Sequence, residues 1–227
     1  DHHTGMSEMI EAITADGVVL DTEGKSSPER QAAADKVRPG VIMYSEGMAV
    51  PKDMEGIVSG RVHNALYYPP LLNLNKFIRP DFAIFRVAEL YLEPIRREYA
   101  LSMFNGYGTE VNQFRPGHPN WVEEDYRFWG RTLRVLRENS SVFTQKQFLP
   151  LLATQRDSMY VNEWPGTNKT LFTLFSLQPA GYRGPLFETP VQAAHHVVDL
   201  WNHTELKPAE KNGRWQIPVD LESFAQK

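Results

Sequence analysis

Two short apolar runs, each ending in an acidic residue, are the part of this sequence best equipped for chemistry. Residues 17–24 (GVVLDTEG) lead to Asp21, and residues 40–47 (GVIMYSEG) lead to Glu46. Hydrolysis of a glycosidic bond needs a carboxylic acid to protonate the leaving oxygen and a carboxylate to attack the sugar or activate water. The pair therefore predicts this kind of acid–base and nucleophilic chemistry.

The two acids can act together only if the elements that carry them are neighbours. Residues 27–37 (SPERQAAADKV), between the two runs, read as a helix, because Ser27 is a suitable N-cap and Pro28 suits the first helical position. Strand, helix and strand in this order form a βαβ unit. In a (β/α)8 barrel, catalytic side chains lie at the carboxyl ends of the strands, so we expect both acids at one end of a parallel sheet.

Further polar side chains near the predicted strand ends extend the candidate site. Glu23 is expected to bind a sugar hydroxyl or to replace one of the two acids. Tyr44 and Arg86 are expected to position the substrate, and an arginine close to Asp21 would keep it ionised by lowering its pKa. The remaining candidates for substrate contacts, for which a simple turn is the competing interpretation, lie in the glycine-rich segment 105–110: Asn105 and Glu110.

Composition and motifs exclude several other classes of function. The formal charge of −4, with a pI near 6.0, gives no basic surface for nucleic acid. The seven histidines lack metal-ligand spacing, cysteine is absent, and residues 106–108 (GYG) match no phosphate-binding loop, so we expect neither metal nor cofactor. No apolar stretch approaches the roughly 20 residues of a membrane span.

The N-terminal sequence DHHTGMSEMIEA is not a signal peptide and does not begin with Met, so we expect the chain to start inside a longer parent. The lack of cysteine fits both a reducing cytosol and a secreted bacterial enzyme. We favour a secreted or periplasmic location.

Elsewhere the pattern predicts two parts. Helices are expected at residues 6–13, 51–58, 93–104 and 120–138, the last with Asn120 as N-cap, and strands at 61–68 and 81–87. After about residue 142, short strand-like runs alternate with Pro/Gly turns, which indicates an antiparallel β-sandwich. We place the boundary between an α/β part, residues 1–145, and an all-β part, residues 146–227.

This layout resembles barrel glycoside hydrolases of the α-amylase/α-galactosidase type, in which a β-sandwich follows a (β/α)8 barrel. The resemblance lies in the acid-ended βα series, the long amphipathic helix FWGRTLRVLRENSSVF, and the segments YVNEWPGTNKTLFTLFSL and HHVVDLWNHTEL. It implies the C-terminal half of a barrel, with strand four ending at Asp21, strand five at Glu46, and strands six to eight near 57–68, 82–88 and 100–106. The missing half would come from the same parent chain or from a separate chain, because a half barrel leaves open sheet edges.

The resemblance further implies that Asp21 is the nucleophile and Glu46 the general acid/base of a glycosidase acting on an oligosaccharide or glycan. Amylase-type enzymes carry an arginine two residues before that aspartate, and this chain has Val19 there. Two other interpretations therefore stay open. One is a carbohydrate-binding or scaffold protein that has lost the chemistry, and the other is a lyase or other barrel enzyme that uses Asp21 and Glu23 with a metal.

Overall fold

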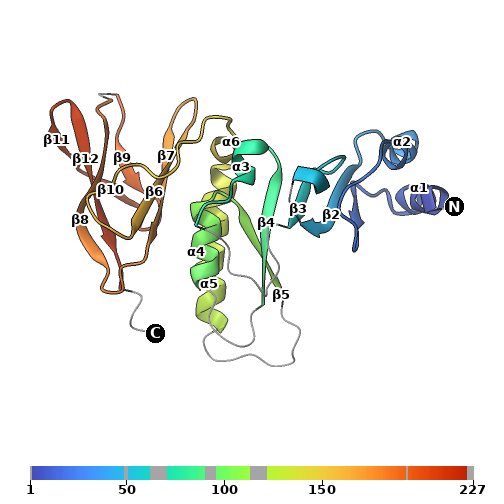
Figure 1. The fold of residues 1–227 in the computed structure, drawn as a ribbon, viewed down its shortest axis with the longest axis horizontal. Coiled ribbons are helices and arrows are strands. Elements are labelled where there is room, and N and C mark those ends of the chain that lie inside the picture. Colours follow the sequence, from blue (N-terminus) through green and yellow to red (C-terminus); the bar gives the residue numbers. More distant parts are fainter. Residues whose placement is uncertain are drawn as a thin grey trace.

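The structure is a computed structural model that describes residues 2–48, 51–61, 71–89, 96–112, 122–192 and 194–223. The molecule is elongated, with a parallel α/β part at one end and antiparallel strands at the other (Figure 1). It therefore consists of part of a barrel followed by a β-rich region, the predicted fold class. The predicted boundary at 145/146 lies after the last helix of the α/β part and before the first antiparallel strand.

Five parallel strands form the sheet of the α/β part. Each strand pairs with the next along the chain, in the order β1-β2-β3-β4-β5. This sequential parallel order is that of successive strands in a (β/α)8 barrel, and among the described residues β1 and β5 each pair on one side only. The strands are β1 Gly17–Leu20, β2 Ile42–Met48, β3 Ser59–Arg61, β4 Ala83–Glu89 and β5 Gly108–Asn112.

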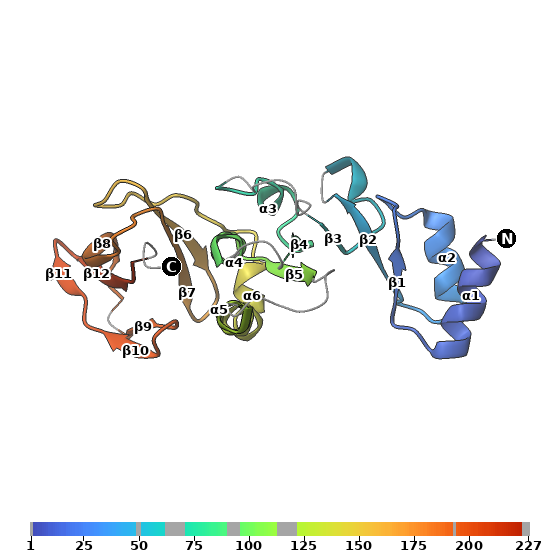
Figure 2. The ribbon, with the colours of Figure 1, turned by 90° about the horizontal axis from the view of Figure 1, so that it is seen from below.

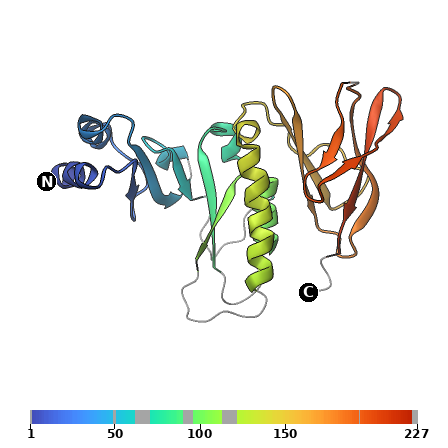
Figure 3. The same ribbon diagram turned by 180° about the vertical axis from the view of Figure 1, so that it is seen from behind.

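Helices precede, connect and follow these strands. The Ser27 hydroxyl accepts a hydrogen bond from the Arg30 backbone N–H, which is the predicted N-cap of α2. Viewed from below, α1 and α2 lie side by side beyond β1, and from behind α5 stands between the parallel sheet and the C-terminal strands (Figures 2 and 3). The helices are α1 His2–Ile13, α2 Pro28–Val37, the 3-10 turn η1 Pro51–Asp53, α3 Asn75–Ile78, α4 Arg96–Phe104, α5 Val122–Glu138 and α6 Ser140–Phe143.

The two faces of the parallel sheet carry different side chains, because successive residues of a strand point to opposite sides. Met43 of β2 and Ile84 of β4 are buried with Ala34 of α2, so they face the helices. Their neighbours Tyr44 and Phe85 meet on the other face, with ring centroids 5.4 Å apart. That second face, which would line a barrel interior, is where the candidate site lies.

The C-terminal strands pack as two antiparallel layers. The pair β6-β7 lies against the sheet β11-β12-β8, and their inward side chains, among them Val161, Phe187 and Ile217, form one apolar cluster. A further pair, β9-β10, completes the region. The strands are β6 Met159–Pro165, β7 Thr170–Ser176, β8 Tyr182–Pro190, β9 Val197–Asp199, β10 Thr204–Leu206, β11 Ala209–Lys211 and β12 Arg214–Leu221.

The β-rich region is joined to the α/β part at the end of α4. The Phe104 backbone carbonyl accepts hydrogen bonds from Asn162 Nδ2 (3.0 Å) and Thr173 Oγ1 (2.7 Å). Thr173 Oγ1 also accepts from the indole N–H of the buried Trp164. Side chains of β6 and β7 thus satisfy a carbonyl that a helix end leaves without an intrahelical partner.

Two predicted elements are corrected by the structure, and a third is almost wholly outside the described residues. The segment 100–106, expected to hold strand eight, contains the end of α4, and the strand is β5, which begins inside the glycine-rich segment. The cause is Gly106, whose φ of +68° ends the helix, with the Tyr107 backbone N–H bonded to the Ser102 carbonyl. The helix expected over 51–58 is only η1, and the strand expected over 61–68 lies almost wholly outside the described residues, as does Asn120.

Candidate active site

Asp21 and Glu46 meet at the carboxyl ends of β1 and β2. The strands are in parallel register, with Leu20 opposite Ser45, so each acid is the next residue along its own strand. The two carboxyl groups are close enough that each shifts the pKa of the other.

The surroundings of Glu46 favour its ionised form. Its Oε2 accepts the Thr22 backbone N–H at 3.0 Å, and its Oε1 lies 2.7 Å from Nη2 of Arg61, at the end of β3. Side-chain hydrogen bonding with Asp21, followed by those contacts, lowers the pKa of Glu46. The same hydrogen bonding and the negative charge of Glu46 raise the pKa of Asp21.

Tyr44 and Glu110 extend the site across the sheet. The Tyr44 hydroxyl lies 3.5 Å from Oε2 of Glu110 on β5, to which it donates a long hydrogen bond. Partial burial, and next the charge of Glu110, raise the pKa of Tyr44, so the phenol is neutral at physiological pH. The cluster of Asp21, Glu46, Arg61, Tyr44 and Glu110 is called the acid cluster below.

Backbone contacts fix how closely β1 and β2 approach at the site. The Gly47 N–H donates to the Glu23 carbonyl at 3.0 Å, and the Ser45 hydroxyl donates to the same carbonyl. A Cβ added at Gly47 would lie 2.6 Å from the Gly24 Cα, a separation that real Cβ atoms do not show. The chain after β1 therefore touches the chain after Glu46 directly.

The other predicted site residues lie outside the acid cluster. Glu23 pairs with Arg30 of α2 at 2.5 Å. Arg86 points to the helical face of β4 and pairs with Glu98 of α4 at 3.3 Å, with both side chains buried. We therefore do not place Glu23 or Arg86 in the site.

Asn105 also lies away from the acids. It is 1% exposed and follows α4, where its side-chain amide donates to the Leu71 and Leu101 carbonyls and its Oδ1 accepts the Asn73 N–H. Its role in the structure is to hold a loop. A substrate contact from Asn105 is not compatible with this burial.

The sequence pattern assigned no role to Arg61. For Glu110 it left two interpretations open, a substrate contact or a simple turn. Arg61 ends the third strand of the series, and Glu110 lies in the fifth, each on the face that carries Tyr44. For Arg61 the signal is the one that found Asp21 and Glu46, a charged residue at the end of a βα repeat. Glu110 lies within β5, and only the assembled sheet brings it beside Tyr44. Among the described residues, no group of three or more acidic or histidine side chains is arranged to hold a metal ion, and no helix is long and apolar enough to cross a membrane.

No protein-family model matches the sequence, and no curated protein matches it. Several solved structures are similar in fold. An α-amylase from Anoxybacillus is 12% identical with a TM-score of 0.63, and the match covers 97% of this chain and 63% of that one. The maltogenic α-amylase AmyB from Thermotoga neapolitana is 14% identical (TM-score 0.56; 96% and 63% covered), and the Nostoc punctiforme debranching enzyme is 12% identical (0.59; 96% and 59%).

The chain has an amylase-type fold. The match runs through both the parallel strands and the antiparallel region, so the partial barrel and the β-rich region belong to one architecture. The chain spans 63% of the length of the Anoxybacillus protein. At these identities the likeness describes the fold, and any activity must be argued from the acid cluster.

Proposed function

We propose that this chain is part of a glycoside hydrolase in which Asp21 and Glu46 are the catalytic carboxyl groups. The observation that carries the proposal is the meeting of the two acids at adjacent parallel strand ends, where Glu46 also accepts the Thr22 N–H and pairs with Arg61. The pKa of Asp21 is raised and that of Glu46 is lowered, which favours one protonated and one ionised carboxyl group, the two states that glycoside hydrolysis requires at the start of the reaction. The amylase-type fold supports the proposal, because the acids lie at the end of the sheet where barrel enzymes bind substrate.

The proposed substrate is an oligosaccharide or glycan. Because the similar structures include α-amylases and a debranching enzyme, α-linked glucans are the first substrates to test. Tyr44 offers an aromatic ring and a neutral hydroxyl beside the acids, a combination that suits contact with a sugar.

The decisive experiment replaces each acid without changing its shape. Asp21→Asn and Glu46→Gln are each expected to lower the hydrolysis rate of an α-glucan or aryl α-glycoside by about 10²–10⁴-fold, because an amide neither transfers the proton nor attacks. Glu55→Gln is the control, since Glu55 forms an exposed pair with Lys25. Circular dichroism must show that each variant is folded, and near-normal turnover in both would refute the assignment.

One observation favours a second function, sugar binding without hydrolysis. Val19, which replaces the family arginine, is 61% exposed and leaves no positive charge on β1 beside Asp21. This alternative predicts that glucans bind, by calorimetry, to a protein that never releases reducing ends. Hydrolysis that Asp21→Asn and Glu46→Gln abolish would exclude it.

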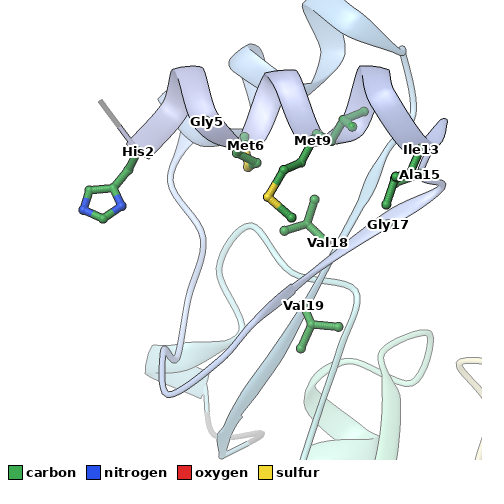
Figure 4. A pocket seen from close by; sticks show the side chains of 10 residues that line it. His2, Gly5, Met6, Met9, Ile13, Ala15, Gly17, Val18 and Val19 are labelled. Atoms are coloured by element: carbon green, nitrogen blue, oxygen red, sulfur yellow. The ribbon is translucent and has the colours of Figure 1, made fainter.

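We further propose that additional barrel strands, from the same parent chain or a separate one, pack against β1. A groove of about 720 Å³ lies between α1 and β1, lined mainly by apolar side chains that include Met6, Met9, Ile13 and Val18 (Figure 4). Met9 and Ile13 are 66% and 69% exposed. An apolar groove beside an unpaired parallel strand suits a further strand and its covering helix.

A further inference from the structure

The backbone directly after Asp21 takes an unusual conformation. Thr22 has a φ of +59°, in the left-handed region that glycine tolerates and a β-branched residue disfavours. Six described non-glycine residues have a positive φ, and Thr22 is the one that directly follows a residue of the acid cluster. Strained backbone of this kind persists only where the surrounding structure holds it, and it is concentrated at functional sites. The backbone of Thr22 is therefore a candidate for a functional role.

The turn that contains Thr22 is held by β2 on both sides. Before it, Leu20 lies opposite Ser45 in the parallel register. The Glu23 N–H donates to the Leu20 carbonyl at 3.4 Å, which closes a turn with Thr22 in its third position. After it, the Glu23 carbonyl accepts the Gly47 N–H at 3.0 Å and the Ser45 hydroxyl. A positive φ at the third position lets the chain reverse this tightly, so contacts with β2 fix the Thr22 peptide group.

This fixed peptide group donates to the Glu46 carboxylate. The Thr22 backbone nitrogen lies 3.0 Å from Oε2, and the Arg61 guanidinium lies 2.7 Å from the other oxygen, Oε1. One oxygen of Glu46 is thus held from β3 by a long side chain, and the other is held by the main chain that follows β1. A main-chain donor has no side-chain rotamers to order, so the fold alone sets its direction.

We propose that Thr22 is a positioning residue, whose left-handed backbone directs its N–H to Glu46 and so fixes the Glu46 carboxyl group beside Asp21 at the end of the sheet. The inference rests on the proposed function and deepens it. A carboxyl group held by donors from two separate elements is restricted in rotation, and correct orientation of reacting groups accounts for a large part of enzymatic rates. The task belongs to the main chain, so the threonine hydroxyl is not required for it.

Removal of the N–H alone tests this role without requiring activity. Semisynthesis of the full chain gives Thr22→Val with either the normal amide or an ester bond before residue 22. Valine keeps the shape of threonine, and the two proteins differ only in that an oxygen replaces the N–H. A hydrogen bond to a carboxylate favours its ionised form, so the Glu46 midpoint, followed by NMR of ¹³C-labelled carboxyl groups, should lie at higher pH in the ester. Equal midpoints in the two proteins would overturn the inference.

Thr22→Gly tests the backbone conformation. Glycine accepts the positive φ without strain and keeps the N–H, so this variant should retain the native Glu46 midpoint. It should also unfold at a higher urea concentration, because relief of left-handed strain exceeds the entropy that glycine adds to the unfolded chain. Thr14→Gly, at φ +51° in the loop before β1, is the control and should share this gain in stability. A Glu46 midpoint that shifts as far in Thr22→Gly as in the ester would overturn the inference.

Hydrolysis of an α-glucan gives the functional readout. The amide-to-ester change should lower kcat by up to about 10²-fold and leave KM unchanged, because the N–H orients an acid and does not contact the sugar. Equal kcat values in ester and amide would overturn the positioning role, even if Asp21→Asn and Glu46→Gln abolish hydrolysis and so uphold the proposed function. Unchanged hydrolysis in both of those variants would refute the proposed function instead. The two failures are therefore distinguishable.

Discussion

At the scale of single residues, the charged side chains of the acid cluster act on each other, whereas Lys76 is a charged residue buried for structural reasons. Lys76 of α3 is 4% exposed, and its ammonium donates to the Pro80 carbonyl at 3.1 Å. Burial lowers its pKa from 10.5 to about 8, and the charge of Asp81 opposes this only in part. Lys76 lies in the loop region between β3 and β4 and has no contact with the acid cluster among the interactions described.

Lys76 gives a prediction about pH. Because its pKa is lower in the folded state, the unfolded chain binds more protons between pH 8 and 10.5, and stability should rise with pH across that window. Lys76→Met removes this dependence. The free energy of unfolding of the native chain should therefore rise by about 3 kcal/mol relative to that of the variant between pH 7 and pH 10.5.

The measurement is urea unfolding of both proteins at a series of pH values. Lys25→Met, at an exposed position, is the control. A constant difference between Lys76→Met and the native chain from pH 7 to 10.5 would contradict the burial effect.

At the scale of elements, glycines set where helices and strands end. Gly106 ends α4 with φ +68°, and a Cβ there would lie 2.8 Å from Phe143 and 2.9 Å from Trp164. Gly213, in the turn between β11 and β12, has a similar φ of +71° but no atom within 4 Å of an added Cβ. The two glycines therefore share the backbone requirement and differ only in packing.

This difference predicts unequal effects of the same substitution. Gly106→Ala should lower the free energy of unfolding by about 2–4 kcal/mol, since left-handed backbone strain adds to a clash in a packed core. Gly213→Ala should cost only the strain, about 1–2 kcal/mol. Chemical denaturation of the two variants compares them, and equal losses would show that the contacts with Phe143 and Trp164 do not matter.

Local patterns in the sequence were enough to predict some of these features and not others. The N-cap at Ser27 and the meeting of Asp21 with Glu46 follow from short-range signals, namely a capping residue and acids at the ends of a βαβ unit. Arg86 was misplaced because one position along a strand reverses the face, and Phe85, not Arg86, faces Tyr44. The pairing of Arg61 with Glu46 joins separate strands, so only the assembled sheet reveals it.

At the scale of the whole molecule, the exposed groove beside β1 is where we propose that further barrel strands pack. Hydrogen exchange should be slower at the β1 backbone amides when the remaining barrel strands are present than in this chain alone, because a new neighbour would bind the free edge. Met9→Lys should reverse this protection by placing a charge in the groove. Glu11→Lys, on the same helix but outside the groove lining, is the control.

Mass spectrometry of deuterium uptake makes the comparison directly. Equal uptake at β1 with and without the additional strands would mean that the groove is not their docking site. Loss of protection in Glu11→Lys as well as in Met9→Lys would point to general disruption of α1.

The contact between Gly47 and Gly24 has a consequence for any attempt to redesign this chain. The interval between the two acids is set by main chain resting on main chain, so it cannot be widened by repacking larger side chains around it. A laboratory library that randomises both glycines should return almost nothing but glycine at position 47, even when selected only for folding. A change in the spacing of the two carboxyl groups would thus have to come from longer or shorter acidic side chains on the same backbone.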